Sequence, residues 1–483
     1  MELEQLLVKH FGYTSFRPGQ REIIEAILEG QDVLALLPTG MGKSLCYQLT
    51  GYVLQKPVLV ISPLLALMQD QVEELKRFGE KRVVALNSFL TAHEKRYTLH
   101  FLEQYRFIFT SPEMLLQQQV QDKLAQMELG LIVVDEAHCI SQWGFDFRPD
   151  YLRIGQWLSM EKRPPVLALS ATATEKVMHD ICQTLSLNRP FEFIYSVDRP
   201  NIRLGRMMFS EKAEKAEKAQ WALQHMTTST GPGILYVASR KRAEQYSQAL
   251  LQAGVHTAAY HAGYGAEDRQ FIQQQFLDGE LDWIVATNAF GMGINKPDIR
   301  QVIHETMPAN VANYMQEIGR AGRDGQPALA ILLYADGDEE LAKFVATNDL
   351  PTAHHVERYQ QLQQQQLLPS QMLKNGEIGE TAFRVLDYWL QQESVEQVVQ
   401  RLNELVVEKY RAVDEMQKII TTKACIRTQL LHYFGQHLKK QPVQCCEICG
   451  IQYEDVQQER RKQVKDIAMM SWQQRLQQLL LGT

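Results

Sequence analysis

A glycine-rich loop between an apolar run and a helical run most strongly limits what this chain can fold into. The apolar segment Val33–Leu37 runs directly into Pro38–Ser44, which reads Pro-Thr-Gly-Met-Gly-Lys-Ser, and a helical pattern follows over Leu45–Tyr52. A glycine-rich turn at such a junction points backbone N–H groups, and the positive end of the helix dipole, at an anion. We therefore predict a phosphate-binding loop. In it, Lys43 would reach the β- and γ-phosphates of a nucleotide and Ser44 would bind Mg²⁺.

Short apolar runs alternate with helical stretches over most of the chain, the rhythm of parallel sheets covered by helices. A first set of predicted strands is Val33–Leu37, Pro57–Ile61, Phe107–Phe109, Leu131–Val134 and Val166–Leu169. A second set is Gly233–Val237, Thr257–Tyr260, Asp282–Ala286, Gln301–His304 and Ala328–Tyr334. We expect an α/β protein with two tandem parallel-sheet domains, at residues 1–203 and 204–350, and a helical region at residues 351–483.

Two carboxylates follow one of these predicted strands, in the sequence Asp135-Glu136-Ala-His138 after Leu131–Val134. Ligands of open α/β sheets bind at the carboxyl ends of the strands. There Asp135 can hold Mg²⁺ and Glu136 can polarise an attacking water, which predicts nucleoside triphosphate hydrolysis. The alternative is that these carboxylates only cap the next helix.

The second predicted sheet carries a polar segment of its own, Gln316–Gly325, which contains Arg320 and Arg323. A spacing of three residues places two side chains on one face of a helix, and we expect both arginines there. Presented from a facing domain, they would neutralise charge on the γ-phosphate in the transition state, with Gln316 beside them. The alternative is surface salt bridging, which explains a glycine-spaced pair poorly.

Four of the seven cysteines fall within 25 residues: Cys425, Cys445, Cys446 and Cys449. In an intracellular chain, four thiolates at this density predict a closed, structural, tetrahedral Zn²⁺ site. Since Cys445 and Cys446 are adjacent, the site requires both side chains to turn the same way. The alternative is a group of unligated, reduced thiols.

Overall composition excludes several classes of protein. The 50 Lys and Arg against 57 Asp and Glu give a net charge of −7, so any nucleic acid must be bound by local patches. No apolar run reaches the length of about 18 residues needed to span a membrane. The acidic start, Met1–Glu4, is unlike a secretory signal. We expect a soluble, cytoplasmic protein with no membrane partner.

Taken together, these motifs resemble the RecQ family of superfamily 2 DNA helicases, over residues 11–325 and again over 425–450. The resemblance implies two RecA-like domains and a zinc-binding subdomain. It also implies that Tyr13 and Arg17 sandwich an adenine whose edge hydrogen-bonds to Gln20, stacking that suits an aromatic ring and a guanidinium. The nucleotide-binding residues expected are then Tyr13, Arg17, Gln20, Pro38, Thr39, Gly40, Met41, Gly42, Lys43, Ser44 and Asp135.

The resemblance extends to segments that hold DNA. Ser62–Gln71 and Thr110–Glu113 are similar to backbone-binding segments of the family, which implicates Ser62 and Ser111. The Ser-Ala-Thr segment that starts at Ser170, with Thr172 and His138, would couple hydrolysis to strand movement. An aromatic-rich segment follows His138 and supplies Trp143, Phe145, Phe147 and Arg148 as DNA-binding residues.

Bases stack on such aromatic faces without sequence preference. Phe145 stands where the family usually has His. For Trp143 and Phe147 the alternative is packing in the core.

The function implied by the resemblance is ATP-driven 3′→5′ DNA strand separation in repair and recombination. Single-stranded and 3′-tailed duplex DNA would be the substrates, and ATP, Mg²⁺ and structural Zn²⁺ would be bound. A single-stranded DNA-binding protein is the expected partner, on the nucleoid if the source is bacterial. The 34 residues after Cys449 suit a short, RecS-like member without the winged-helix and C-terminal helical domains. Two alternatives stay open: an RNA helicase, and a DNA-binding ATPase that translocates or clamps with little unwinding.

Overall fold

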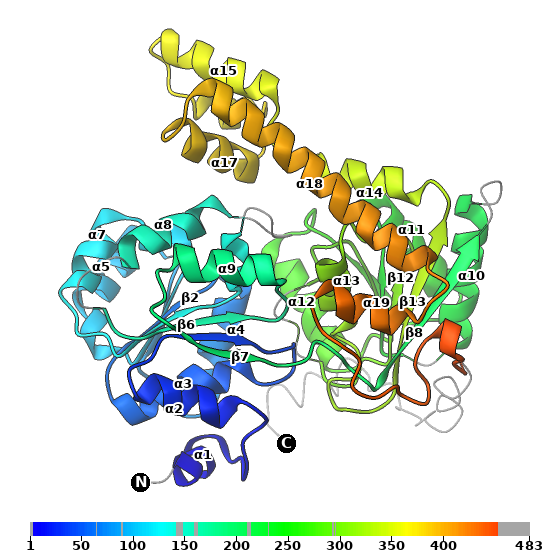
Figure 1. Ribbon diagram of the computed structural model, residues 1–483, viewed down its shortest axis with the longest axis horizontal. Coiled ribbons are helices and arrows are strands. Elements are labelled where there is room, and N and C mark those ends of the chain that lie inside the picture. Colours follow the sequence, from blue (N-terminus) through cyan, green and yellow to red (C-terminus); the bar gives the residue numbers. More distant parts are fainter. Residues whose placement is uncertain are drawn as a thin grey trace, which may run out of the picture.

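The structure is a computed structural model that describes residues 3–63, 65–87, 90–141, 148–158, 163–209, 214–229, 231–291, 294 and 296–452. Two parallel sheets lie beside each other, each with helices on both faces, and an arm of helices extends from the second sheet over the first (Figure 1). The predicted architecture of two tandem parallel-sheet α/β domains is confirmed.

The first sheet has the strand order β3-β4-β2-β5-β6-β1-β7, and all its strands are parallel. Its strands are β1 Val33–Leu36, β2 Val58–Ile61, β3 Val83–Leu86, β4 Phe107–Thr110, β5 Leu131–Val134, β6 Val166–Ser170 and β7 Phe191–Ile194. Its helices are α1 Leu3–Phe11, α2 Gln20–Leu28, α3 Lys43–Leu54, α4 Leu65–Arg77, α5 Ala92–His100, α6 Pro112–Leu115, α7 Gln118–Ala125, α8 Pro149–Leu158 and α9 Glu175–Thr184.

Both faces of this sheet are buried, which is why its strands are continuous apolar runs rather than alternating ones. In β1, Val33 and Ala35 pack into the core on one face, whereas Leu34 and Leu36 pack into the core on the other.

The second sheet has the order β10-β11-β9-β12-β13-β8 and is also parallel. Its strands are β8 Ile202–Phe209, β9 Gly233–Tyr236, β10 Thr257–Tyr260, β11 Trp283–Ala286, β12 Gln301–His304 and β13 Ala328–Ala335. Its helices are α10 Glu214–Thr228, α11 Arg240–Gln252, α12 Ala266–Leu277, α13 Val311–Ile318 and α14 Asp338–Thr347. The expected domain division at residues 203 and 204 falls inside β8.

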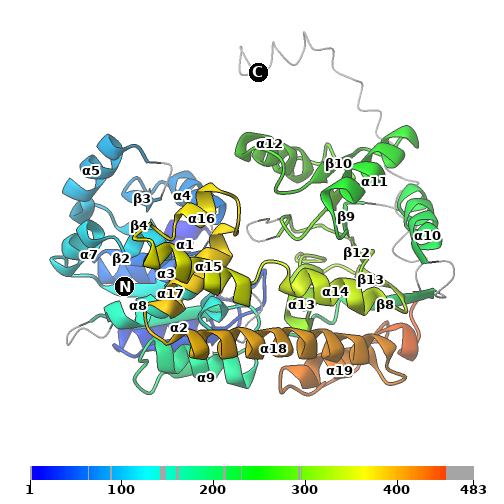
Figure 2. The same ribbon diagram turned by 90° about the horizontal axis from the view of Figure 1, so that it is seen from above.

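The helical arm consists of α15 Ala353–Gln364, α16 Gln371–Lys374, α17 Glu380–Leu390 and the 27-residue α18 Val395–Thr421. Its first part has its own core, formed by residues such as Tyr359, Trp389 and Leu402, and lies against α8 of the first sheet (Figures 1 and 2). The far half of α18 contributes Val413 and Met416 to the core of the second sheet. The helix therefore bridges the two sheets, and α19 Ile426–Tyr433 follows it.

Every predicted strand is confirmed to within one residue at each end, and the described part of the expected helical region from residue 351 onward contains α15 to α19. Three strands were not predicted: β3, β7 and β8. Among the described residues, no helix combines the length and the apolar character needed to cross a membrane.

Candidate active site

The predicted motifs of the first domain lie side by side along one edge of the first sheet, because the strands that lead to them are neighbours in that sheet. Along the order β4-β2-β5-β6-β1, the carboxyl ends of the strands lead in turn to Ser111, Ser62, Asp135, Ser170 and Pro38. Parallel strands end at the same edge of a sheet, so residues far apart in sequence meet there.

The phosphate loop has the geometry that its glycines predict. Gly40 and Gly42 have φ angles of 87° and 74°, in the left-handed region that favours glycine. At Gly42, which precedes the first residue of α3, a Cβ would come within 2.7 Å of the Gln20 side-chain amide. Helix α3 begins at Lys43, two residues earlier than predicted, so Ser44 lies in its first turn.

The Lys43 ammonium is buried at this loop. Within the described part of the chain its Nζ has no hydrogen-bond partner, and it forms a longer ion pair with Glu136 Oε1 at 3.6 Å. A buried donor without an acceptor is costly unless an acceptor arrives. The loop, the helix start and Lys43 therefore fit the phosphates of a nucleotide.

Asp135 and Glu136 follow β5 in a strained turn. Glu136 has a φ of 47°, rare for a residue with a side chain, and its N–H donates to Asp135 Oδ1 at 3.0 Å. Burial first, and then the Glu136 charge, raise the pKa of Asp135 above its usual range, although Lys43 opposes the shift. A divalent cation would relieve this repulsion, so the pair fits Mg²⁺. Tyr151 on α8 donates its hydroxyl to the Asp135 carbonyl at 3.0 Å.

His138 connects this turn to the end of β6. Its Nδ1 lies 3.0 Å from Ser170 Oγ and 3.4 Å from Glu136 Oε2. The Ser170 hydroxyl donates to the Thr172 carbonyl at 3.1 Å. The structure thus brings together all three residues predicted to couple hydrolysis to movement.

The predicted adenine-binding residues are only partly brought together. The buried Gln20 amide donates to the carbonyls of Met41 and Gly42, each at 3.0 Å, and its Oε1 accepts from the Arg17 N–H at 2.8 Å. Arg17 also donates to the Gly40 carbonyl, whereas Tyr13 is 54% exposed. Gln20 therefore holds the phosphate loop itself in this structure, and its bond to an adenine stays a prediction.

The two arginines do not lie on a helix, so that prediction was wrong. Helix α13 ends at Ile318, and Arg320 and Arg323 lie in the turn that follows. Gly319 and Gly322 interrupt the helix. The carbonyls of both glycines accept hydrogen bonds from the Arg199 side chain instead of from helical N–H groups.

This turn touches the phosphate loop of the other domain. Thr39 donates its hydroxyl to the Gly319 carbonyl at 3.1 Å, and a Cβ on Gly40 would lie 3.3 Å from Arg323 Cγ. Burial, followed by the charges of Arg320 and Arg199, lowers the pKa of Arg323 to about 9. Gathered cations in a dry site favour an incoming anion.

Gln316 lies on α13 and lines a cavity of about 30 Å³ between the two domains. Pro38 and Thr39 of the phosphate loop line the same cavity. The structure thus brings Gln316 and Arg323 to the phosphate loop, whereas the Arg320 guanidinium donates to the Gly291 carbonyl of its own domain.

The predicted DNA-binding residues are placed unevenly. Trp143, Phe145 and Phe147 lie outside the described residues. Arg148 donates to the Pro63 carbonyl at 2.9 Å, and the Ser111 hydroxyl accepts from the Met114 N–H at 3.3 Å as the N-cap of α6. Ser62 is buried, with no hydrogen-bond partner for its Oγ among the described residues.

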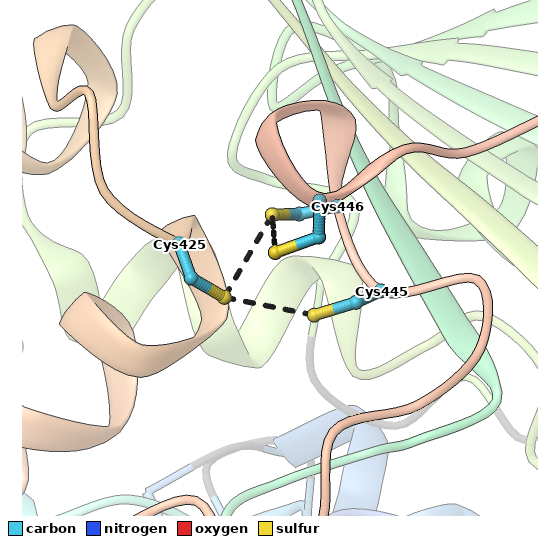
Figure 3. Close-up of side chains that lie close together, drawn as sticks. Cys425, Cys445 and Cys446 are labelled. Atoms are coloured by element: carbon cyan, nitrogen blue, oxygen red, sulfur yellow. Dashed lines mark hydrogen bonds between the residues drawn. The ribbon is translucent and has the colours of Figure 1, made fainter.

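The four predicted metal ligands converge, and Figure 3 shows Cys425, Cys445 and Cys446 facing one another. Their sulfurs are separated by 3.6 Å for Cys425–Cys445, 3.8 Å for Cys425–Cys446 and 3.5 Å for Cys446–Cys449, and all four lie within 4.8 Å of one another. Tetrahedral zinc with Zn–S bonds of about 2.3 Å sets its sulfurs about 3.8 Å apart. The adjacent Cys445 and Cys446 do turn the same way, and the set fits Zn²⁺.

Sequence reasoning missed the segment that joins the domains, Asp198–Asn201. Arg199 and Asn201 both bind carbonyls of the turn that carries the two arginines. The available signal was a polar Asp-Arg-Pro-Asn cluster placed directly between the two sets of strands.

Comparison with known protein families finds three matching models. The DEAD/DEAH box helicase model matches residues 17–181, the helicase conserved C-terminal domain matches residues 214–325, and the RecQ zinc-binding model matches residues 384–450. Together they cover strands β1 to β6 of the first sheet, β9 to β12 of the second, and the cysteine cluster.

Among curated proteins, the chain is 40% identical over 490 residues to the probable ATP-dependent DNA helicase RecS of Bacillus subtilis, covering 99% of this chain and 98% of that protein. It is 34% identical to the ATP-dependent DNA helicase RecQ of Pasteurella multocida, covering 91% of this chain but 61% of that longer protein. Among solved structures, the DUF1998 helicase MrfA bound to DNA matches with a TM-score of 0.59 at 20% identity, over 71% of this chain and 52% of that one. This last likeness concerns the fold alone.

Proposed function

Because the chain belongs to the RecQ family of superfamily 2 DNA helicases, we propose that it couples ATP hydrolysis to 3′→5′ movement along DNA and to strand separation. One observation carries this proposal. In the second domain, residues 319–324 form the turn that carries Arg320 and Arg323, which we call the arginine turn. Thr39 of the phosphate loop and Gly319 of the arginine turn are 280 residues apart, and they form a direct hydrogen bond. A site shared between two domains can convert hydrolysis into relative domain movement.

In the proposed site, the first domain binds and activates the nucleotide. The backbone N–H groups from Thr39 to Ser44 would surround the phosphates, and the Lys43 ammonium, which lies 3.6 Å from Glu136 Oε1, would neutralise them. Mg²⁺, held by Ser44 and Asp135, would supply charge neutralisation at the phosphate oxygens. Glu136 orients and polarises the attacking water, with His138 against its other carboxylate oxygen.

The second domain contributes Gln316, Arg320 and Arg323 to the same nucleotide. The guanidinium groups of Arg320 and Arg323 would stabilise negative charge on the transferring phosphoryl group, a contribution worth about 10³-fold or more in related chemistry. Because they belong to the other sheet, this stabilisation depends on the two domains being close.

DNA is proposed to bind along the edge where β2 and β4 end, near Ser62, Ser111 and Arg148. Stacking on Trp143, Phe145 and Phe147 would add affinity without sequence preference. The contacts among Glu136, His138, Ser170 and Thr172 support a coupling route from the DNA edge to the attacking water. Tyr13, Arg17 and Gln20 would receive the adenine.

Zn²⁺ held by Cys425, Cys445, Cys446 and Cys449 would have a structural role, since four thiolates leave no open position for chemistry. Repair and recombination, action on the nucleoid, and a single-stranded DNA-binding protein as partner belong to the same proposal.

Strand displacement with ATP on 3′-tailed DNA, 5′-tailed DNA and 3′-tailed RNA duplexes tests the proposal, with Lys43→Ala as the inactive control. Displacement of the 3′-tailed DNA alone is expected. Release of the 5′-tailed strand alone would overturn the polarity, and equal release of RNA would favour the RNA helicase. DNA-stimulated hydrolysis without displacement would favour a translocase.

A further inference from the structure

The guanidinium of Arg199 lies at the centre of the contacts between the domain linker and the arginine turn. Its Nη1 donates to the Gly319 carbonyl at 3.2 Å, and its Nη2 donates to Ala321 at 3.1 Å and to Gly322 at 2.6 Å. These three carbonyls flank Arg320 and immediately precede Arg323.

These three carbonyls belong to buried residues past the end of α13, where the helix supplies no N–H to them. Buried carbonyls must find donors elsewhere. One planar guanidinium with several fixed donors can satisfy all three, which a lysine ammonium on a flexible stem cannot do with the same geometry. Arg199 therefore helps to fix the backbone path through residues 319–322, together with Asn201, which donates to the Gly322 carbonyl at 2.8 Å.

The Gly319 carbonyl is also the acceptor for Thr39 of the phosphate loop, so Arg199 and the loop share one atom. Arg199, Gln316 and Thr39 line the same cavity of about 30 Å³. A shift of the Arg199 side chain would thus move the arginine turn relative to the phosphate loop.

The backbone of Arg199 is itself anchored by the cysteine-bearing subdomain. The buried Arg427, two residues after Cys425, donates to the Arg199 carbonyl at 3.0 Å and to the Cys445 carbonyl at 3.2 Å. It also binds the Asp198 carboxylate and the Ile202 carbonyl. Arg427 therefore fixes the backbone of Arg199, while the Arg199 side chain binds the arginine turn.

We propose that Arg199 is a positioning residue for hydrolysis: by binding the carbonyls of Gly319, Ala321 and Gly322, it sets the orientation in which Arg320 and Arg323 meet the γ-phosphate. This inference rests on the proposed function, in which those two arginines act on the nucleotide. Arg199 itself touches no reacting atom.

Turnover and nucleotide affinity of Arg199→Lys and Arg199→Gln test the inference in the full-length protein. A misplacement near 1 Å can cost about 100-fold in rate, so kcat of DNA-stimulated ATP hydrolysis should fall about 10- to 100-fold. The Kd for a fluorescent ADP analogue should stay within about twofold, because the ground-state phosphate contacts lie in the first domain. Turnover is normalised to titrated ADP-binding sites, so partial unfolding does not imitate the effect.

Arg300→Ala is the matched control. The Arg300 guanidinium donates to the carbonyls of Asp298 and Pro327 and to the Asp324 carboxylate, and none of these groups is a carbonyl that Arg199 binds. The Arg300→Ala substitution should therefore leave kcat unchanged. A fully active Arg199→Lys would overturn the inference, since lysine keeps the charge but not the three-carbonyl geometry.

Combination with Arg320→Ala separates positioning from general stability. If Arg199 acts through Arg320, the double variant should be little slower than Arg320→Ala alone, whereas independent effects would multiply. Multiplicative losses would overturn the inference. Loss of kcat in Arg320→Ala and Arg323→Ala with an unaffected Arg199→Gln would overturn it and leave the proposed function intact. Full activity of the Arg320 and Arg323 variants would overturn both.

Discussion

At the scale of single residues, the closeness of Lys43 and Glu136 explains how two charges are kept in a buried site before a nucleotide arrives. The 3.6 Å separation of Nζ and Oε1 is an ion-pair distance but not a hydrogen bond. Lys43 is therefore partly neutralised yet still able to bind phosphate. Glu136 then keeps its carboxylate for a water molecule.

Lys43→Ala should lose both nucleotide binding and turnover, whereas Glu136→Gln should keep binding and lose about 100-fold or more in kcat, because only the water-activating carboxylate is gone. Titration with a fluorescent ADP analogue and a steady-state ATPase assay with single-stranded DNA measure the two effects. Glu103→Gln, at an exposed ion pair with Lys123, should change neither. Turnover like that of the unmodified protein in Glu136→Gln would exclude its proposed role.

Asp32 is a second residue whose charge can be tested, this time through stability. The carboxylate accepts from both Nη atoms of Arg163 at 2.7 Å and from the N–H groups of Val166 and Asn188 at 2.9 Å. Burial opposes the charge, but Arg163 and the two N–H groups outweigh it and lower the pKa of Asp32.

A carboxyl whose pKa is lowered in the folded state stabilises that state at pH values above 3.8, its pKa in the unfolded chain. This contribution is lost as the pH falls through the lower pKa of the folded state. Asp32→Asn should therefore reduce the free energy of unfolding by about 3 kcal/mol at pH 7, and the difference should shrink on acidification below pH 3.8. Urea denaturation at several pH values measures it. Glu128→Gln, at an exposed pair with Lys56, is the control. A difference that does not change with pH would contradict this assignment.

At the scale of elements, the strands that the sequence failed to predict share one property: β3, β7 and β8 are all edge strands. An edge strand has a neighbour on one side only and needs less apolar surface. In β7, exposed residues alternate with half-buried ones, and β8 carries Arg203, Gly205 and Arg206. Interior strands, buried on both faces, were predicted almost to the residue because their apolar runs are continuous.

The same contrast holds for the candidate site. The phosphate loop and the Asp135 turn could be predicted because each motif sits in a local strand–turn–helix context. The arginine turn could not, because its carbonyls are bound by Arg199 and Asn201, about 120 residues away in sequence. Spacing alone predicted a helix face, although Gly319 and Gly322 were a visible signal against one.

The cysteine cluster gives a prediction at this scale, because it ties α19 to the segment that starts at Cys445. Purified protein should contain about one zinc per chain, and Cys446→Ser should lose zinc and melt at a lower temperature, since structural zinc contributes to folding. Metal analysis and thermal denaturation measure both. Cys182→Ser, at a half-buried thiol on α9 outside the cluster, should change neither. Zinc-free protein whose Cys446→Ser variant melts normally would identify the cluster as plain thiols.

At the scale of the whole molecule, α18 connects the two domains, because its first half packs in the core of the arm and its second half in the core of the second sheet. Its 27 residues span about 40 Å at 1.5 Å per residue. The far half packs Val413 and Met416 into the apolar core of the second sheet. The arm at its other end meets the first domain through Leu152 of α8, which packs against the core of the arm, and through Arg384, whose Nη1 lies 3.2 Å from the Asp150 carboxylate and 3.1 Å from that of Glu113.

Because the two ends of this connection are held differently, we expect the contacts with the first domain to break first when the distance between the two sheets changes. Apolar burial holds the far half of α18, whereas the Arg384 contacts are partly exposed and screened by solvent. Arg384→Ala should therefore release the arm from α8, visible as faster amide hydrogen exchange in α8 and α17 with unchanged exchange in residues 413–421. Arg358→Ala, which breaks an ion pair with Glu377 inside the arm, should leave α8 unchanged.

Faster exchange in residues 413–421 instead of α8 would mean that the helix yields at the second sheet. Because α8 also carries Tyr151, whose hydroxyl binds the Asp135 carbonyl, release of the arm should reach the nucleotide site as well. The Arg384→Ala variant should then show a changed KM for ATP that Arg358→Ala does not share.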